Sequence, residues 1–211
     1  MGIDLKMGKL VIKAHEVVHF PSSMSDKEIR GFVKEETGFS VRRLDNVTLI
    51  ALSAVDRLVK GNETAEHLAL YSGAEYMSVG LFQSVIHAME NDEAIRPYDF
   101  IATVGNAANF YLTKEFDIRG PNIFIGSSEN TLLKNCLLAE VDLTLGHCQQ
   151  AIIVIWHIND EEQRCHTLLV EQAKETETNI KGWDNPITNS DELLTLAMTS
   201  ECPLLLNLNC D

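Results

Sequence analysis

The sequence predicts an α/β fold with a mostly buried mixed sheet flanked by helices. Segments with the properties of strands and of helices alternate along the chain, which is typical of this class. The run AIIVIWHI at 151–158 is almost wholly apolar, the pattern of a strand buried on both faces. The 211 residues, 45% of them apolar, suffice for one sizeable core. We expect a single domain over 1–211, with its core at about 9–160 and an extension at 161–211.

The first third of the chain contains four predicted elements. The segment 9–20 is rich in β-branched residues and stops at Pro21, which predicts a strand. The segment 25–36 opens with a Ser-Asp pair suited to capping and predicts a short helix. In 46–62 apolar residues recur at helical spacing up to a Lys-Gly stop signal. The segment 67–74 predicts a strand that runs into a turn of small residues.

The middle third predicts two more helices. The segment 75–91 is amphipathic, and its apolar side carries Met77, Leu81, Val85, Ile86 and Met89. A loop and another helix are expected over 97–116. These two segments lead to the strand and helix that carry the most informative motif of the sequence.

That motif is a strand at 122–125 that turns sharply into a helix ending near residue 145. The turn contains Ser127, Ser128 and Glu129. Backbone N–H groups at the start of a helix are unpaired, and the helix dipole favours negative charge there, so such corners often hold a nucleophile or an anion. The G-x-S-x-G elbow of serine hydrolases is absent from the run Gly-Ser-Ser-Glu-Asn. We therefore expect Ser127 or Ser128 to cap the helix, with Glu129 in its first turn.

The last fifty residues change in character. A strand is expected at 164–172, a polar loop at 174–190, and a helix followed by a strand at 190–209. The sequence contains no internal repeat and no low-complexity tract.

Composition limits the partners and the compartment. The net charge is −14, without a Lys/Arg stripe interleaved with aromatic residues, so we expect neither a nucleic-acid partner nor a membrane partner. The longest apolar run is too short to span a bilayer, and the N-terminal stretch does not follow the signal-peptide pattern. Five cysteines without CxxC spacing fit a reduced cytoplasm, which is the expected location. No cofactor is predicted.

The sequence HEVVH at 15–19 matches the zinc-protease pattern H-E-x-x-H. That chemistry requires a helix, on which His15 and His19 would share one face and converge on the metal. This segment has a strand pattern, in which the two histidines lie roughly 13 Å apart. We favour a structural role, and keep a zinc metalloprotease as an alternative of a different class.

Three ordered segments resemble the N-terminal half of the β-ketoacyl synthases, which have the thiolase fold. They are YSGAEYMSVGLFQSVIHAMEND, RPYDFIATVGNAANFYLTKEFDIRGPNIFIGSSENTLLKN and QAIIVIWHIND. In that family the strand after an Arg/Lys-Gly-Pro step leads to a cysteine nucleophile at the head of a buried helix. Arg119-Gly120-Pro121 matches this step, and Asn106 matches an asparagine of the preceding helix. The resemblance covers roughly residues 49–160 and implies half of a thiolase-like fold.

Two departures from the family bear on function. Counted from Gly120, the position of the nucleophile falls on Glu129, and a carboxylate cannot form the acyl thioester that carries a growing chain. The 51 residues after Asp160 cannot contain the family's C-terminal half, which supplies the catalytic histidines. We therefore expect no ketosynthase chemistry from this chain alone, although whether it is an enzyme stays open.

Within this superfamily, chain-length factors also lack the cysteine and pair with an active ketosynthase. The resemblance implies a non-catalytic subunit that pairs with a full-length ketosynthase, with an acyl carrier protein as an indirect partner. It would shape the acyl pocket in fatty acid or polyketide elongation, which includes the elongation of polyene chains. The residues implied at the interface or pocket are Tyr98, Asp99, Phe100, Asn106, Asn122, Ile123, Phe124 and Ile125. A malonyl-carrier decarboxylase that uses Glu129 is the alternative within the same fold.

Overall fold

A computed structural model describes residues 9–76, 79–126, 129–158, 162–173, 180–183, 185, 187, 189–206 and 208. The helices are α1 (Asp26–Thr37), α2 (Asn46–Gly61), α3 (Val79–Glu90), α4 (Pro97–Ala102), α5 (Ala107–Glu115), α6 (Thr131–Thr144) and α7 (Ser190–Thr199). The strands are β1 (Leu10–Pro21), β2 (Leu68–Ala74), β3 (Asn122–Gly126), β4 (Gln150–Ile158), β5 (Glu162–Gln172), β6 (Lys181–Trp183) and β7 (Leu204–Leu206).

The strands of the described residues form one mixed sheet in the order β3-β2-β4-β5-β1-β7-β6. β2 runs parallel to β3 and β4, whereas β5 is antiparallel to both β4 and β1. The predicted α/β class with a mixed sheet is therefore confirmed. β5 begins at Glu162 and lies in the centre of the sheet, so the sheet includes part of the predicted extension.

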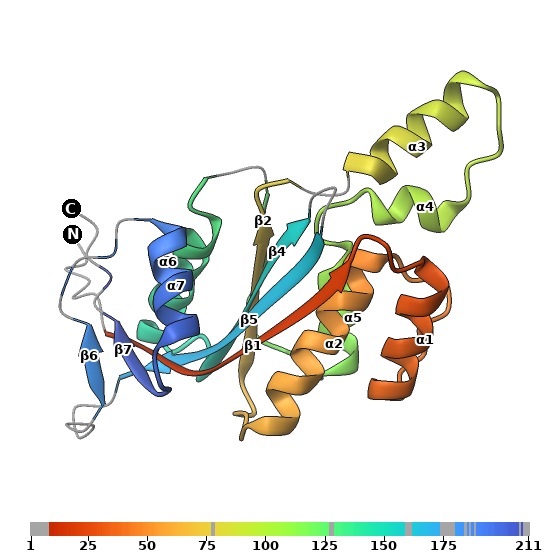
Figure 1. Cartoon of the computed structure of the whole chain (residues 1–211). Helices are drawn as coiled ribbons and strands as arrows, with labels where there is room; N and C mark the ends of the chain where they lie inside the picture. Colours follow the sequence, from red (N-terminus) through yellow and green to blue (C-terminus); the bar gives the residue numbers. More distant parts are fainter. Residues whose placement is uncertain are drawn as a thin grey trace.

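Helices cover the sheet on both faces, with α1, α2 and α5 on one face and α6 and α7 on the other (Figure 1). One buried apolar cluster lies on the α2 side, where Leu49, Ile50 and Trp156 are almost fully inaccessible. The second cluster lies on the α6 side. β4 contributes to both, because Ile152 and Val154 belong to the first cluster and Ile153 and Ile155 to the second. The prediction that 151–158 is buried on both faces is confirmed.

Local signals at the ends of the helices agree with the prediction. Ser25 caps α1 in a full capping box with Glu28, and Gly38 closes that helix in a left-handed conformation. Asp45 caps α2 by accepting a hydrogen bond from the Thr48 N–H. The first strand ends at Pro21 as predicted.

The C-terminal segment covers the sheet on the α6 side. Leu193, Leu196 and Ala197 of α7 are buried in the cluster that also contains the sheet-facing residues of α6. β7 extends the sheet by pairing with the first three residues of β1, and β6 pairs with β7. Within the predicted polar loop, the residues 181–183 thus form an edge strand.

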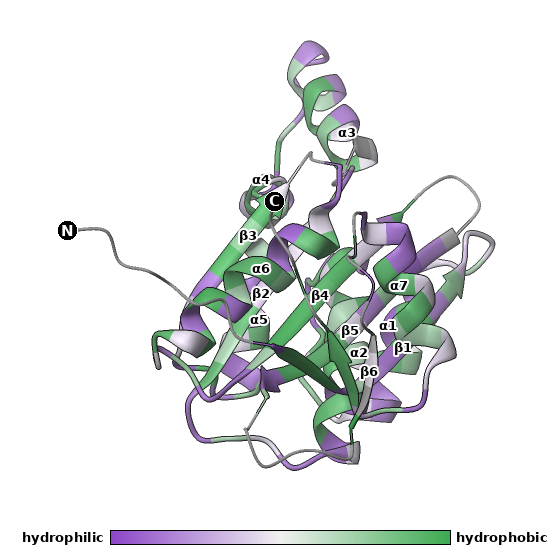
Figure 2. Ribbon diagram, turned by 90° about the vertical axis from the view of Figure 1, so that its left-hand side faces the viewer, coloured by the Kyte–Doolittle hydropathy of each residue, from purple (hydrophilic) through white to green (hydrophobic). Residues whose placement is uncertain are grey.

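The helices α3 and α4 project from the rest of the molecule (Figure 1). We call residues 79–104, which contain both helices, the arm. The expected helix at 75–91 is present as α3. Of its predicted apolar side, Met77 lies outside the described residues, Val85 is buried, and Ile86 and Met89 are exposed. Segment 97–116 contains two helices, α4 and α5, where a loop and one helix were expected. Figure 2 shows hydrophobic and hydrophilic residues alternating along α3. None of the described helices is long and apolar enough to cross a membrane.

Candidate functional site

The corner between β3 and α6 differs from the expected one. Ser127 and Ser128 lie outside the described residues, and α6 begins at Thr131. Its N-cap is Asn130, in the left-handed conformation with φ of 58°. Asparagine tolerates this conformation better than most residues. The left-handed backbone at Asn130 turns the chain once more, and the helix starts only at Thr131. The prediction that Ser127 or Ser128 caps the helix with Glu129 in its first turn is therefore wrong, because Glu129 precedes the cap.

The first turn of α6 is capped by the C-terminal segment. The Leu133 N–H donates to Ser190 Oγ over 3.1 Å, and the Ser190 N–H donates to Asn130 Oδ1 over 3.0 Å. Side-chain oxygens at a helix start satisfy backbone donors that have no partner within the helix. The partners are about sixty residues apart in sequence, so no local pattern could have identified this cap.

Gly73 of β2 lets the corner approach the sheet closely. A Cβ atom at this position would clash with the Ile125 carbonyl oxygen and with Cγ2 of Thr131.

Asn109 of α5 bonds to the residue before Gly73 and to β3. It accepts a hydrogen bond from the Ser72 hydroxyl and donates one to Asn122 Oδ1. Asn109 is thus the buried asparagine that connects α5 to the sheet. The predicted Asn106 is exposed at the start of α5 and makes no side-chain capping bond.

A cavity of about 310 Å³ lies at this corner. Glu75, Glu129, His157, Ser190 and Asp191 are among the side chains that line it. They come from the ends of β2 and β4, from the turn before α6 and from the start of α7. Three of the lining side chains carry carboxylates, so the cavity is better suited to hold polar or cationic groups than to stabilise an oxyanion.

The described part of the chain places no reactive thiol at the corner. Cys136 and Cys165 are fully buried, and burial raises the pKa of both thiols far above the ordinary range. Burial, with a smaller effect of Asp142, raises the pKa of Cys148 to about 11. Thiols with such pKa values are not ionised at neutral pH, and the thiolate is the nucleophilic form.

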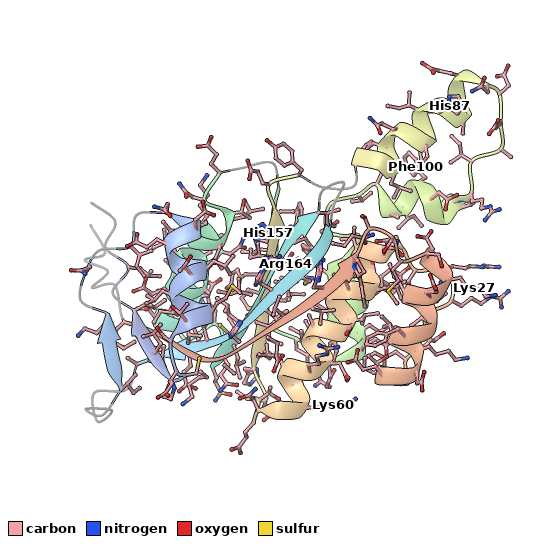
Figure 3. All side chains as sticks on the ribbon, viewed as in Figure 1. Lys27, Lys60, His87, Phe100, His157 and Arg164 are labelled. Atoms are coloured by element: carbon pink, nitrogen blue, oxygen red, sulfur yellow. The ribbon has the colours of Figure 1, made fainter. Side chains whose placement is uncertain are left out.

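Four histidines lie on the α6 side of the sheet, namely His15, His19, His157 and His166. The register pairs His157 with Arg164, Arg164 with His19, and His166 with Val17. His157 and Arg164 lie side by side there (Figure 3). The ring centroids of His157 and His166 are 5.3 Å apart. Sequence analysis missed this group because β1 lies more than a hundred residues before β4 and β5, and only the strand register brings the three together.

Burial controls the charge of this group. His166 is almost fully inaccessible, and neither ring nitrogen has a hydrogen-bond partner among the described residues. Burial, followed by the nearby His157, Arg164 and His15, lowers the pKa of His166 to about 3. Burial also lowers the pKa of His15. His166 is therefore neutral at physiological pH.

The HEVVH segment forms part of β1, as predicted. His15 and His19 lie four residues apart on an extended strand, and the described residues include no group of three side chains that could hold a metal ion. The helical arrangement that a zinc protease of this pattern requires is absent from β1.

The residues predicted at an interface lie in two places. Asn122, Ile123, Phe124 and Ile125 form β3, the edge strand, which pairs only with β2 among the described strands. Tyr98, Asp99 and Phe100 lie on α4, a short helix where a loop was expected. The side chain of Tyr98 lies outside the described part, whereas that of Phe100 is exposed on the arm.

The arm has an apolar surface. Between 46 and 64% of the side chain is exposed at each of Phe82, Ile86, Met89, Phe100, Ile101 and Val104. Single exposed apolar residues are ordinary on protein surfaces, but a group on one projecting element is typical of an interaction site. Only Val85 among the described α3 side chains is buried.

Comparisons with known proteins identify the fold. No protein-family model matches the chain, and no curated protein sequence matches it. Several solved structures do match. The ketosynthase ApeO in complex with its chain length factor ApeC, from Xenorhabdus doucetiae, is 14% identical, with a TM-score of 0.58 over 79% of this chain and 80% of the matched chain.

Two further solved structures match the same fold. The ishigamide ketosynthase/chain length factor is 16% identical, with a TM-score of 0.64 over 81% of this chain and 64% of the other. A type II polyketide synthase acyl-carrier protein in complex with its hexaketide-bound ketosynthase (AntDE:AntF) is 11% identical, with a TM-score of 0.58 over 79% of this chain and 63% of the other. At such identities the likeness establishes the fold alone. This protein has the thiolase-like fold of ketosynthases and corresponds to one half of it.

Proposed function

We propose that this protein is a non-catalytic, chain-length-factor-like subunit that pairs with a full-length β-ketoacyl synthase. It shapes the acyl pocket of that enzyme during fatty acid, polyketide or polyene elongation on an acyl carrier protein, in the cytoplasm. The observation that carries the proposal is the exposed apolar surface of the arm. Apolar surface of this kind is stabilised when a second protein covers it.

The open edge of β3 supports the same partner. Backbone N–H and C=O groups on an unpaired strand edge form hydrogen bonds readily with another strand. By the family resemblance, dimers join through the strand that corresponds to Asn122–Ile125. The arm then brings Asp99 and Phe100 toward the acyl pocket of the partner, where the size of the Phe100 side chain would limit the length of the chain.

The chemistry of the corner supports a non-catalytic role. Glu129 is exposed, and a carboxylate does not form the thioester that ketosynthases require. Burial raises the pKa of the Cys136, Cys148 and Cys165 thiols, and Cys202 is the one exposed cysteine among the described residues. In the structure of ApeO with ApeC, the match covers 79% of this chain and 80% of the matched chain, so the two chains are of similar length.

The test is co-expression with a ketosynthase encoded beside this gene, followed by size-exclusion chromatography with light scattering. We expect a stable complex that contains both chains. The double variant Ile86→Asp/Met89→Asp should abolish it, because two charges would be placed on the arm surface. The matched control Met198→Asp changes an exposed methionine on α7 and should leave the complex intact. A wild-type chain that binds no ketosynthase would disprove the proposal.

The pocket-shaping role has its own measurement. Phe100→Ala should lengthen the products of the complex and Phe100→Trp should shorten them, as measured by mass spectrometry of the acyl chains. The amount of complex should not change. Unaltered product length in both variants would separate partner binding from pocket shaping.

A decarboxylase remains the second candidate, because Glu129 and His157 line the same cavity. A carboxylate and an imidazole are suitable groups for proton transfer. Release of CO₂ from malonyl-carrier protein by the isolated chain, lost in Glu129→Gln and kept in Glu93→Gln, would favour this activity. Glu93 is exposed in the loop between α3 and α4, far from the corner in sequence.

A further inference from the structure

A cleft of about 1160 Å³ lies between the arm and the N-terminal ends of α1 and α2. The body contributes Arg30, Arg43 and Leu44 to its walls, and the arm contributes Leu81, Arg96 and Ala102. The volume is of the order found for small-molecule sites. The cleft is separate from the cavity at the β3–α6 corner, with which it shares no lining residue.

Three guanidinium groups, from both sides of the cleft, contribute to its lining. Arg30 is held in place because its Nη2 donates to the Leu44 carbonyl oxygen over 3.0 Å. Its Nε is buried and has no hydrogen-bond partner among the described residues. Arg96 lies opposite on the arm and is exposed.

The carboxylates of the cleft are mostly engaged within the protein. Asp45 accepts hydrogen bonds from the Thr48 N–H over 2.9 Å and from the Thr48 hydroxyl over 2.8 Å. Asp26 accepts one from Asn46 Nδ2 over 2.7 Å. Asp99 is the third carboxylate and lies on the arm. The three arginines and three aspartates that line the cleft balance in formal charge, so an anion would bind there through the hydrogen-bond donors of Arg30 and Arg96 and not through a net positive charge.

We propose that this cleft binds an organic anion with one carboxylate or phosphate head group and a short aliphatic body. The head group lies between Arg30 and Arg96, because a guanidinium binds carboxylate and phosphate oxygens in a bidentate manner. The aliphatic body packs against Leu44, Leu81 and Ala102. Since the ligand contacts both the arm and the body, its binding restricts the position of the arm. Binding itself does not depend on the proposed partner function, whereas any effect on ketosynthase pairing does.

Calorimetric titration of the full chain, without a ketosynthase, tests the ligand class. Octyl phosphate and octanoate should each bind saturably with one site, and the stronger of the two identifies the head group. Octanol and octylamine, which have the same aliphatic body, should bind at least ten times more weakly. Octanol that binds as tightly as the anions, or the failure of both anions to bind, would overturn the proposal.

Matched arginine variants locate the site. Arg96→Gln changes an exposed residue and should weaken binding of the anions by about tenfold or more, as expected for loss of a charge-assisted hydrogen bond. Arg30→Gln should have a similar effect. Arg42→Gln is the control, since Arg42 is exposed next to Arg43 but does not line the cleft. An equal loss in Arg42→Gln would indicate general charge attraction and contradict a defined site.

A second readout follows the arm. Saturating octyl phosphate should slow proteolysis in the loop at 91–96 of the wild-type chain and have no such effect on Arg96→Gln. Lys27, which points away from α1 into solvent and does not line the cleft, provides a further control as Lys27→Gln (Figure 3). If the anions bind but no ketosynthase pairs with the chain, only the partner function fails. If a ketosynthase pairs but no anion binds, only this proposal fails.

Discussion

The α6 side of the sheet and the arm both present apolar helix surface, yet only the former is covered by the chain itself. Leu193, Leu196 and Ala197 of α7 pack into the cluster on the α6 side. On the arm, Phe82 and Met89 remain exposed. The difference shows that apolar periodicity specifies a surface to be covered but does not specify which element, or which molecule, covers it. The α6 side is a core, and the arm has the properties of an interface.

The α6 side is itself covered unevenly. Where α6 and α7 lie over the sheet, the inward residues are apolar, such as Ile153, Leu168 and Val170. Toward the ends of β4 and β5, the same face carries His157 and Arg164, which have access to solvent. Polar side chains at the uncovered rows avoid the instability of an exposed apolar sheet. His166 departs from this pattern, because it is polar and almost fully inaccessible.

The largest expected effect concerns the covering helix. Leu193→Ala should lower the free energy of unfolding by about 2–5 kcal/mol, because Leu193 is fully buried and the change leaves a cavity between α7 and α6. Met198→Ala on the exposed side of the same helix should change it by less than about 0.5 kcal/mol. Urea denaturation followed by circular dichroism measures both. Equal effects in the two variants would mean that α7 does not form part of the core.

A smaller effect concerns a buried acid on α6. Glu140 is 1% exposed, and neither carboxylate oxygen has a hydrogen-bond partner among the described residues. Burial raises its pKa to about 7. Between pH 4.5 and 7 the folded state holds a proton that the unfolded state has lost, so the free energy of unfolding decreases as pH rises through this window.

We expect this decrease to be about 1–3 kcal/mol in total. Glu140→Gln should remove it and raise stability at pH 8, whereas Glu90→Gln, on the exposed side of the arm, should keep the wild-type profile. Denaturation curves collected at intervals from pH 4.5 to pH 8 provide the test. A Glu140→Gln profile that still falls with pH would show that another group is responsible.

The sequence predicted most elements because their signals are local. The β-branched run before Pro21 predicted β1, Ser25 predicted the start of α1, and the Lys-Gly pair predicted the end of α2 at Gly61. Properties that depend on distant residues were not predictable. The apolar side of α3 has the same periodicity as a buried helix but lies exposed, and β5 belongs to the centre of the sheet.

At the candidate site, the sequence predicted the strand-to-helix corner between β3 and α6 but not the way in which the helix begins. The start of α6 depends on the left-handed Asn130 and on Ser190, which lies sixty residues farther along the chain. The histidines of the α6 side come together only through strand register. A single sequence contains no direct signal for contacts of this kind, because periodicity describes each element separately.

The cap from Ser190 gives a third prediction, with a moderate effect. Ser190→Ala removes the acceptor of the Leu133 N–H and should lower the free energy of unfolding by about 1 kcal/mol. Thr195→Ala, at an exposed position of the same helix, is the control and should change stability little. Chemical denaturation gives the difference. No loss in Ser190→Ala would mean that water replaces the hydroxyl without cost and that α7 is held by its apolar residues alone.

The smallest expected effect on stability belongs to the arm, and it is the sharpest test of the comparison. Phe82→Ser should change the free energy of unfolding by less than about 0.5 kcal/mol, because the side chain is 46% exposed and does not belong to either buried cluster. Hydrogen exchange of α3 amides should be fast in the isolated chain, since the helix has few buried contacts. Slow exchange, or a loss comparable with that of Leu193→Ala, would make the arm part of the core. Fast exchange that becomes slow only when a ketosynthase is added would identify the arm as the surface that its partner covers.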